Sequence, residues 1–216
     1  MRRIGVVLLA FCALLLPTAA RADAIPAWLP SIVNEFGTVT ITDAGIFSKR
    51  SELKNFYGIT APQGHSLGSV SFSTGPLTSG SIFGGGTFSS YDSTFDVIGV
   101  GRWAKKLTGQ SSSPVALFTG SFVGPIQWKL VSHTGEYEYV FTLRAEVNGT
   151  LWNGRIIYGS VKQTIYLNEN QWARDHQGRI GLGSAQFKLS PEPGTLGLLA
   201  TGLLAVVAMR RKILGF

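Results

Sequence analysis

The centre of the chain alternates apolar and polar positions with a period of two. From Tyr137 to Val147 every odd-numbered residue is apolar or aromatic, and the residues between them are mostly charged or polar. Successive side chains of a β-strand point to opposite faces, so this pattern predicts a strand with one face in a core and one in solvent. Asn148-Gly149 follows directly and favours the positive φ angles of a hairpin turn, which predicts that the strand ends there.

The rest of the region between Ile25 and Leu189 shows almost no helical periodicity. Asn153-Gly154 repeats the turn signal, and residues 155–167 predict a further strand with Gly159 as a candidate bulge. Short strands separated by turn signals predict an all-β fold, a single antiparallel β-sandwich of jelly-roll type with a barrel as the alternative. Other predicted strands lie at 37–42, 46–47, 67–73, 81–88, 95–100, 115–123, 126–132 and 183–189.

The N-terminal end has the layout of a secretory signal peptide. Two arginines precede an apolar stretch from Ile4 to Leu16, and the small residues Ala20 and Ala22 follow in an A-x-A pattern. Thirteen apolar residues would span about 20 Å of a hydrocarbon core that is roughly 30 Å thick. The sequence therefore predicts a signal helix over residues 1–22, removed by signal peptidase after Ala22, and a mature β body over residues 23–189.

The C-terminal end predicts a short membrane anchor. Residues 195–209 are apolar or small throughout, and Arg210, Arg211 and Lys212 follow at once. Basic residues are retained on the cytoplasmic side of a membrane, so this cluster predicts a stop-transfer signal after a transmembrane helix over 195–209. Fifteen residues make a short span, which flanking side chains can extend by snorkelling.

The tail over residues 190–212 also carries a family resemblance. Pro191, Glu192 and Pro193, the apolar stretch with its glycines and the basic cluster stand in the order of the PEP-CTERM sorting signal of Gram-negative bacteria, which the tail resembles. The resemblance implies processing by exosortase, an integral membrane cysteine protease or transpeptidase, near Pro-Glu-Pro. It also implies export across the inner membrane, a transient anchor, and then a place at the envelope surface or in the extracellular matrix. Such proteins are associated with exopolysaccharide and with biofilm or floc formation.

The ends also account for the net charge of +7. Six of the nineteen basic residues lie in the two end segments, whereas all twelve acids lie between them. The body over residues 23–192 is therefore close to neutral, at +1. A basic protein often binds nucleic acid, but here the excess belongs to the topology signals, so we expect no nucleic-acid partner.

Residues Gly64-His65-Ser66-Leu67-Gly68 match the Gly-x-Ser-x-Gly motif of lipases and esterases. In those enzymes the serine stands on a tight turn between a buried strand and a helix. Here Ala61-Pro62-Gln63 precedes the motif and a strand-like run over residues 69–75 follows it. We therefore expect Ser66 to be a turn residue and the protein not to be an enzyme; a hydrolase using Ser66 is the remaining alternative.

Metal and thiol chemistry have little support in the sequence. The one cysteine, Cys12, lies in the signal peptide, so the mature body has no disulfide and no thiolate ligand. His65, His133 and His176 have no metal-binding spacing. We expect neither a metal nor a cofactor.

Aromatic residues offer one further candidate site. Trp103 and Trp172 lie among charged residues, which makes them the best candidates for exposed rings that stack on sugars. Besides the Ser66 hydrolase, the sequence thus leaves two non-catalytic functions open: a structural or adhesive protein, which we expect, and a carbohydrate-binding module for exopolysaccharide as the alternative.

Overall fold

A computed structural model describes residues 32–135 and 138–189 of the chain. The signal peptide, the Pro-Glu-Pro signal, the anchor over 195–209 and the basic cluster lie outside the described residues. The elements are β1 (Ile32–Glu35), β2 (Thr38–Thr42), β3 (Gly45–Phe56), β4 (Ile59–Thr60), β5 (Gly68–Ser73), β6 (Leu77–Ser81), β7 (Gly85–Phe88), β8 (Thr94–Gly99), α2 (Arg102–Thr108), β9 (Val115–Thr134), β10 (Glu138–Leu151), β11 (Ile156–Asn168), α3 (Glu169–Asp175) and β12 (Gln177–Leu189).

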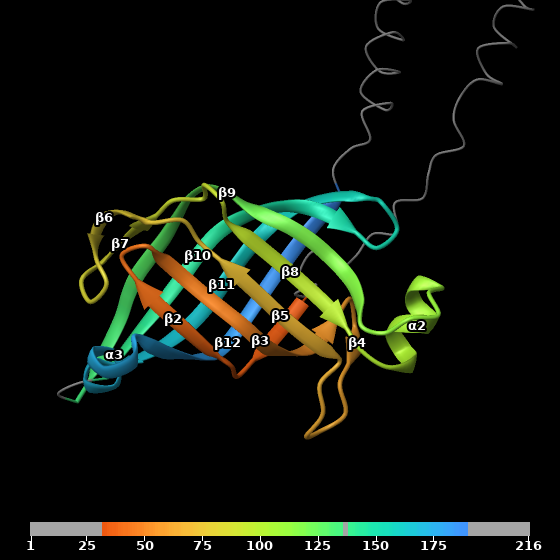
Figure 1. Ribbon diagram of the computed structural model, residues 1–216, viewed down its shortest axis with the longest axis horizontal. Coiled ribbons are helices and arrows are strands. Elements are labelled where there is room, and N and C mark those ends of the chain that lie inside the picture. Colours follow the sequence, from red (N-terminus) through yellow and green to blue (C-terminus); the bar gives the residue numbers. More distant parts are fainter. Residues whose placement is uncertain (1–31, 136–137, 190–216) are drawn as a thin grey trace, which may run out of the picture.

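The strands close into an antiparallel barrel. Eight of them pair in the order β10, β11, β12, β1, β3, β5, β8, β9, and β9 then pairs with β10, which completes the ring (Figure 1). The all-β prediction is confirmed. The architecture is the barrel alternative and not two separate packed sheets, because the long strands β9 and β10 pair with each other and join what would have been two sheet edges.

One position in the ring is shared by two short strands. β1 pairs with residues 182–185 of β12, and β2 pairs with residues 177–179 of the same strand, while both also pair with β3. The chain breaks between them at Phe36 and Gly37, whose φ angles are 58° and 103°. This break turns one long strand into two and leaves Phe36 exposed on the barrel wall.

β9 is a single strand of 20 residues, where the sequence predicted two strands. Val123 pairs with Glu146 and Gln127 pairs with Arg144, so four steps along β9 match two along β10. The extra residues form a bulge around Pro125, which lacks the N–H that a ladder needs and therefore favours such a position. The bulge lets β9 continue past the interruption that the sequence suggested.

The predicted turn at Asn148-Gly149 is wrong. β10 runs through these residues to Leu151, and the chain turns at Asn153-Gly154 instead. Gly149 lies opposite Gly120 of β9, and a Cβ on either would overlap the backbone of the other strand and the ring of Phe118. The glycine therefore serves the close approach of two strands and not a turn.

The neighbouring strand β11 matches the predicted strand over 155–167, but Gly159 is not at a bulge. Its pairing with Val147 and Phe187 is regular, and the register of β11 shifts only later, between Thr164 and Ile165. A Cβ at Gly159 would overlap the backbone of β12, so this glycine too allows close packing.

Aromatic and aliphatic side chains fill the interior of the barrel. Trp128 is buried and stacks on Phe141 with ring centroids 4.2 Å apart, and its indole N–H donates a hydrogen bond of 2.7 Å to the carbonyl of Ile82. The odd-numbered residues of β10 from Phe141 to Val147 are buried, as the alternation predicted.

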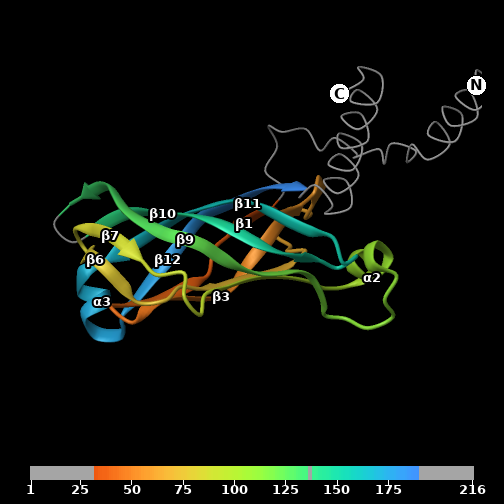
Figure 2. The same cartoon turned by 90° about the horizontal axis from the view of Figure 1, so that it is seen from above.

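Two short helices that the sequence analysis missed lie at opposite ends of the barrel (Figures 1 and 2). α3 begins after Asn168, whose side-chain oxygen accepts a hydrogen bond from the N–H of Gln171, so a capping signal was present in the sequence.

The predicted strand over 81–88 is a hairpin of β6 and β7 that turns at residues 82–84. Within the described ranges, no helix is long and apolar enough to cross a membrane.

Candidate functional site

Ser66 lies in an exposed loop between β4 and β5. The N–H of His65 bonds to the carbonyl of Pro62 in a turn, and β5 begins at Gly68, so the loop leads into a strand and not into a helix. This is the local structure that the neighbours of the motif predicted. It lacks the strand–turn–helix geometry that raises a nucleophilic serine.

Trp103 and Trp172 anchor the two helices to the barrel. Each is half-buried; the indole N–H of Trp103 donates to the carbonyl of Leu67 at 2.9 Å, and that of Trp172 donates to the carbonyl of Ile41 at 2.8 Å. Trp103 is on α2 and Trp172 is on α3, so the structure places them at opposite ends of the molecule and does not bring them together (Figure 1).

The three histidines have different surroundings in the structure. His133 stacks on Tyr139, His176 caps the end of α3 beside Trp172, and His65 is in the loop with Ser66. Within residues 32–135 and 138–189, no group of three or more His, Cys, Asp or Glu side chains is placed to hold a metal ion.

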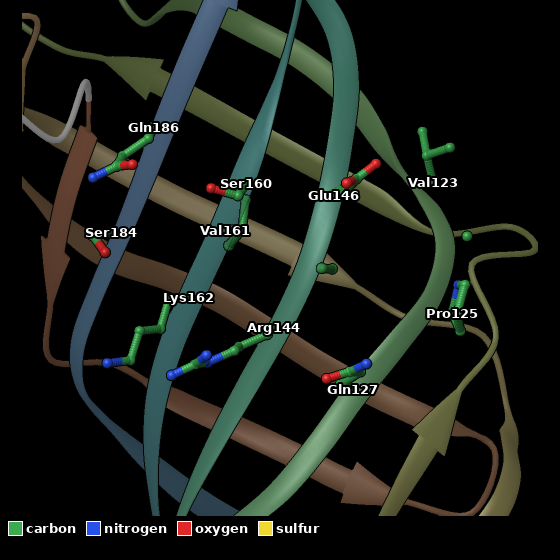
Figure 3. A pocket seen from close by; sticks show the side chains of 12 residues that line it. Val123, Pro125, Gln127, Arg144, Glu146, Ser160, Val161, Lys162, Ser184 and Gln186 are labelled. Carbon is green, nitrogen blue, oxygen red and sulfur yellow. The ribbon is translucent and has the colours of Figure 1, made fainter. Parts of the chain in front are cut away.

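A groove of about 710 Å³ lies on the outer face of β9 to β12 (Figure 3). Two cross-strand rows of outward side chains form its floor, because the register aligns alternate residues of four adjacent strands. The first row is Gln127, Arg144, Lys162 and Ser184, and the second is Val123, Glu146, Ser160 and Gln186.

Arg144 and Lys162 are directly opposite each other on β10 and β11, and both side chains are exposed. In Figure 3 they extend in the same direction, whereas Glu146 points the other way. Within the part of the chain that the structure describes, the one ion pair joins Lys54 to Glu52, so neither groove cation has a carboxylate partner there. The floor of the groove therefore carries two adjacent positive charges.

The groove is bordered by the bulge of β9 and adjoins a smaller hollow that contains an exposed tyrosine. Val123 and Pro125 line it along β9 (Figure 3). A second hollow of about 270 Å³ adjoins it, shares Val123 and Glu146, and is lined by Ile156 and Tyr158 of β11. Tyr158 is 46% exposed. The groove thus continues from a charged, polar part into an apolar part with an aromatic ring.

The comparison with protein families concerns the tail. Residues 191–212 match the model of the PEP-CTERM protein-sorting motif. The chain carries a PEP-CTERM sorting motif. The match confirms the resemblance drawn from Pro191-Glu192-Pro193 and the basic cluster, and the PEP-CTERM motif implies export, processing by exosortase and sorting to the envelope surface. No curated protein and no solved structure shows significant similarity to the chain.

The PEP-CTERM motif begins directly after the barrel. β12 ends at Leu189 and the motif starts at Pro191, two positions later. β12 is a member of the closed ring, so processing within the motif leaves every strand of the barrel in place.

Sequence reasoning did not find the groove. The alternation places Arg144 and Glu146 on the solvent side of one predicted strand, and Lys162 lies in another predicted strand. A signal did exist, since pairing the two predicted strands through the turn at Asn153-Gly154 brings Arg144 opposite Lys162. Like charges directly opposite each other destabilise a sheet, so such a pair is worth noting in a sequence.

Proposed function

We propose that this PEP-CTERM protein is a non-catalytic component of the cell surface or extracellular matrix, with a structural or adhesive role in exopolysaccharide or biofilm. The observation that carries the proposal is the position of the sorting motif, two residues after the last strand of a closed barrel. An intact folded module is thereby delivered to the outside. In this proposal the apolar segment over residues 195–209, which the sequence predicts to cross the membrane, anchors the chain until exosortase acts.

The absence of catalysis belongs to the same proposal. It is supported by the loop position of Ser66, which is exposed and feeds β5. The loop of Ser66 contains His65, and no hydrogen bond joins the side chains of these two residues within the described ranges. An activated serine needs a base within hydrogen-bond reach, which this loop does not provide.

The test follows the protein in cells with and without exosortase. With exosortase, we expect a shortened form at the cell surface or in the matrix; without it, we expect a longer form that stays in the membrane with its tail intact. Mass spectrometry of the C-terminal peptide distinguishes the two. An identical mass and location in both strains would overturn the sorting proposal. A chain with Ser66→Ala that retains its effect on matrix or adhesion supports the absence of catalysis, and loss of that effect contradicts it.

Carbohydrate binding is the second candidate function. The anchoring roles of Trp103 and Trp172 leave them poorly placed as sugar platforms, since each ring is half-buried and each indole N–H has a protein partner. The groove on β9 to β12 supports this candidate better, because it combines polar side chains with exposed Tyr158.

A further inference from the structure

The groove contains an electrostatic arrangement that the barrel itself does not need. Arg144 and Lys162 are a cross-strand pair of like charge, and like charges in that position destabilise the sheet. Glu146 is on the same strand as Arg144 but points away from both cations (Figure 3). An anion bound between the two cations would relieve their repulsion.

The polar side chains around the cations have free hydrogen-bonding groups. Ser160 and Gln186 lie in the row next to the cations, and Ser184 and Gln127 flank the cations themselves. In the described part of the chain, none of these four side chains makes a hydrogen bond to another protein group. Hydroxyl and amide groups both donate and accept, so they suit a ligand that carries many hydroxyls.

The aromatic end of the groove is in line with the cations. Tyr158, Ser160 and Lys162 are alternate residues of β11 and share its outer face. Lys162 and Tyr158 are four residues apart, which corresponds to roughly 13 Å along the strand. An amphipathic aromatic ring of this kind accepts the apolar face of a sugar. The groove thus offers charge at one point and an aromatic ring further along, over a length greater than a single sugar.

We propose that the groove over β9 to β12 binds an acidic polysaccharide, a chain of sugars that bears carboxylates. Arg144 and Lys162 contact a carboxylate, the serine and glutamine side chains bond to sugar hydroxyls, and Tyr158 contacts a sugar ring. The inference rests on the proposed location outside the cell and adds the chemical class of the ligand. Exposed cations bind a single anion weakly, but a polymer with repeated carboxylates presents many copies to each groove and raises the apparent affinity.

The test measures binding of the full-length chain, purified in mild detergent, to polygalacturonate and to dextran as the neutral comparator. We expect binding to polygalacturonate that weakens as salt is added, and none to dextran. The double variant Arg144→Gln/Lys162→Gln loses two charge-assisted contacts, so its affinity falls about tenfold or more. The variant Arg144→Lys/Lys162→Arg keeps both charges and retains binding. Tyr158→Ala weakens binding without changing its salt dependence.

The matched control is Arg102→Gln/Lys106→Gln. It also removes one arginine and one lysine, both exposed, but from α2 and not from the groove. We expect it to bind as the unaltered chain does. Circular dichroism and thermal melting verify that each variant is folded, and removing the repulsion between Arg144 and Lys162 should not lower the melting temperature.

Several results would overturn the proposal. An equal loss in the groove and control variants would assign binding to overall charge, and equal affinity for double-stranded DNA would show the same. Binding to dextran that ignores the groove variants would place glycan recognition elsewhere, and no binding to polygalacturonate would remove the ligand. A dimer abolished by the groove variants, without glycan binding, would assign the face to a second copy. None of these results changes where exosortase sends the protein, so the proposed function stands or falls separately.

Discussion

Asn34 and Gln163 hydrogen-bond to each other inside the barrel through both of their amide groups, with two N···O distances of 3.1 Å. Both side chains are fully buried, and the Asn34 amide also donates to the Ser51 hydroxyl at 2.7 Å. Gly183 lies between them in the sheet, paired with Asn34 on one side and with Gln163 on the other. The absence of a side chain at Gly183 is what lets the two amides meet across β12.

Gly183→Ala tests this arrangement. A Cβ at this position would overlap the side-chain oxygens of both Asn34 and Gln163, so the amides must separate or the strands must move. Overpacking and buried amides without partners together should lower the free energy of unfolding by about 2 to 4 kcal/mol, measured by urea denaturation. Ser184→Ala, one residue along and facing outward, is the control and should change it by less than about 0.5 kcal/mol. A neutral result at Gly183 would contradict the tight packing of the amide pair.

Trp172→Phe tests whether this residue is an anchor. The variant keeps an aromatic ring against Phe83 but loses the donor to the carbonyl of Ile41, which should cost about 1 kcal/mol of stability. We expect a lower melting temperature and unchanged binding to polygalacturonate. Tyr91→Phe, at a site that is 75% exposed, should change neither. Lost glycan binding at unchanged stability would instead assign a sugar-contacting role to Trp172.

Asp96 on β8 makes the stability of the barrel depend on pH. Burial raises the pKa of this carboxyl, and the hydrogen bond with the side chain of Thr119 opposes the rise in part. The folded state therefore holds the proton to a higher pH than the unfolded chain, so stability is lost as the pH rises through the pKa of the folded state. Asp96→Asn should raise the melting temperature at neutral pH, and the gain should disappear in acid below the pKa of the unfolded chain. A gain that persists unchanged in acid would point to a cause other than ionisation.

The start of the exported chain can be determined directly. The A-x-A pattern at Ala20 and Ala22 predicts that signal peptidase leaves Asp23 as the first residue. N-terminal sequencing of the surface form checks this, and a start at Met1 would refute cleavage. Replacing Ala22 with a bulky residue such as Tyr should leave a longer, membrane-retained precursor.

Residue patterns predicted the strands well where one face is buried. The predicted alternation reappears in β10 from Phe141 to Val147, where the odd-numbered residues are buried, although Thr142 between them is buried too. The loop around Ser66 follows from its neighbours. These features are local, because a period of two or a turn depends on residues that are adjacent in the sequence.

The predictions failed where the structure at a residue depends on contacts with a strand that is distant in the sequence. In the sequence, Gly149 resembles a turn residue. In the structure, it packs against Gly120 and the ring of Phe118, which leave no room for a side chain. In the sequence, Pro125 resembles the end of a strand. In the structure, β9 pairs with β10 on both sides of Pro125, so the strand continues through a bulge. The groove was missed for the same reason, because Arg144 and Lys162 become neighbours only when β10 and β11 pair in register.

The pairing of β1 with β12 has a consequence for the order of events during export. Ile32 lies opposite Ala185, so the ring cannot close until the first described strand, β1, pairs with the last, β12. Contacts between such distant residues form slowly, and β12 stands immediately before the sorting motif in the chain. If export begins at the N-terminus, the ring can therefore close only after β12 has crossed the membrane, just ahead of the sorting motif. A tail that stays in the membrane until the ring has closed would keep an unfinished barrel from being released.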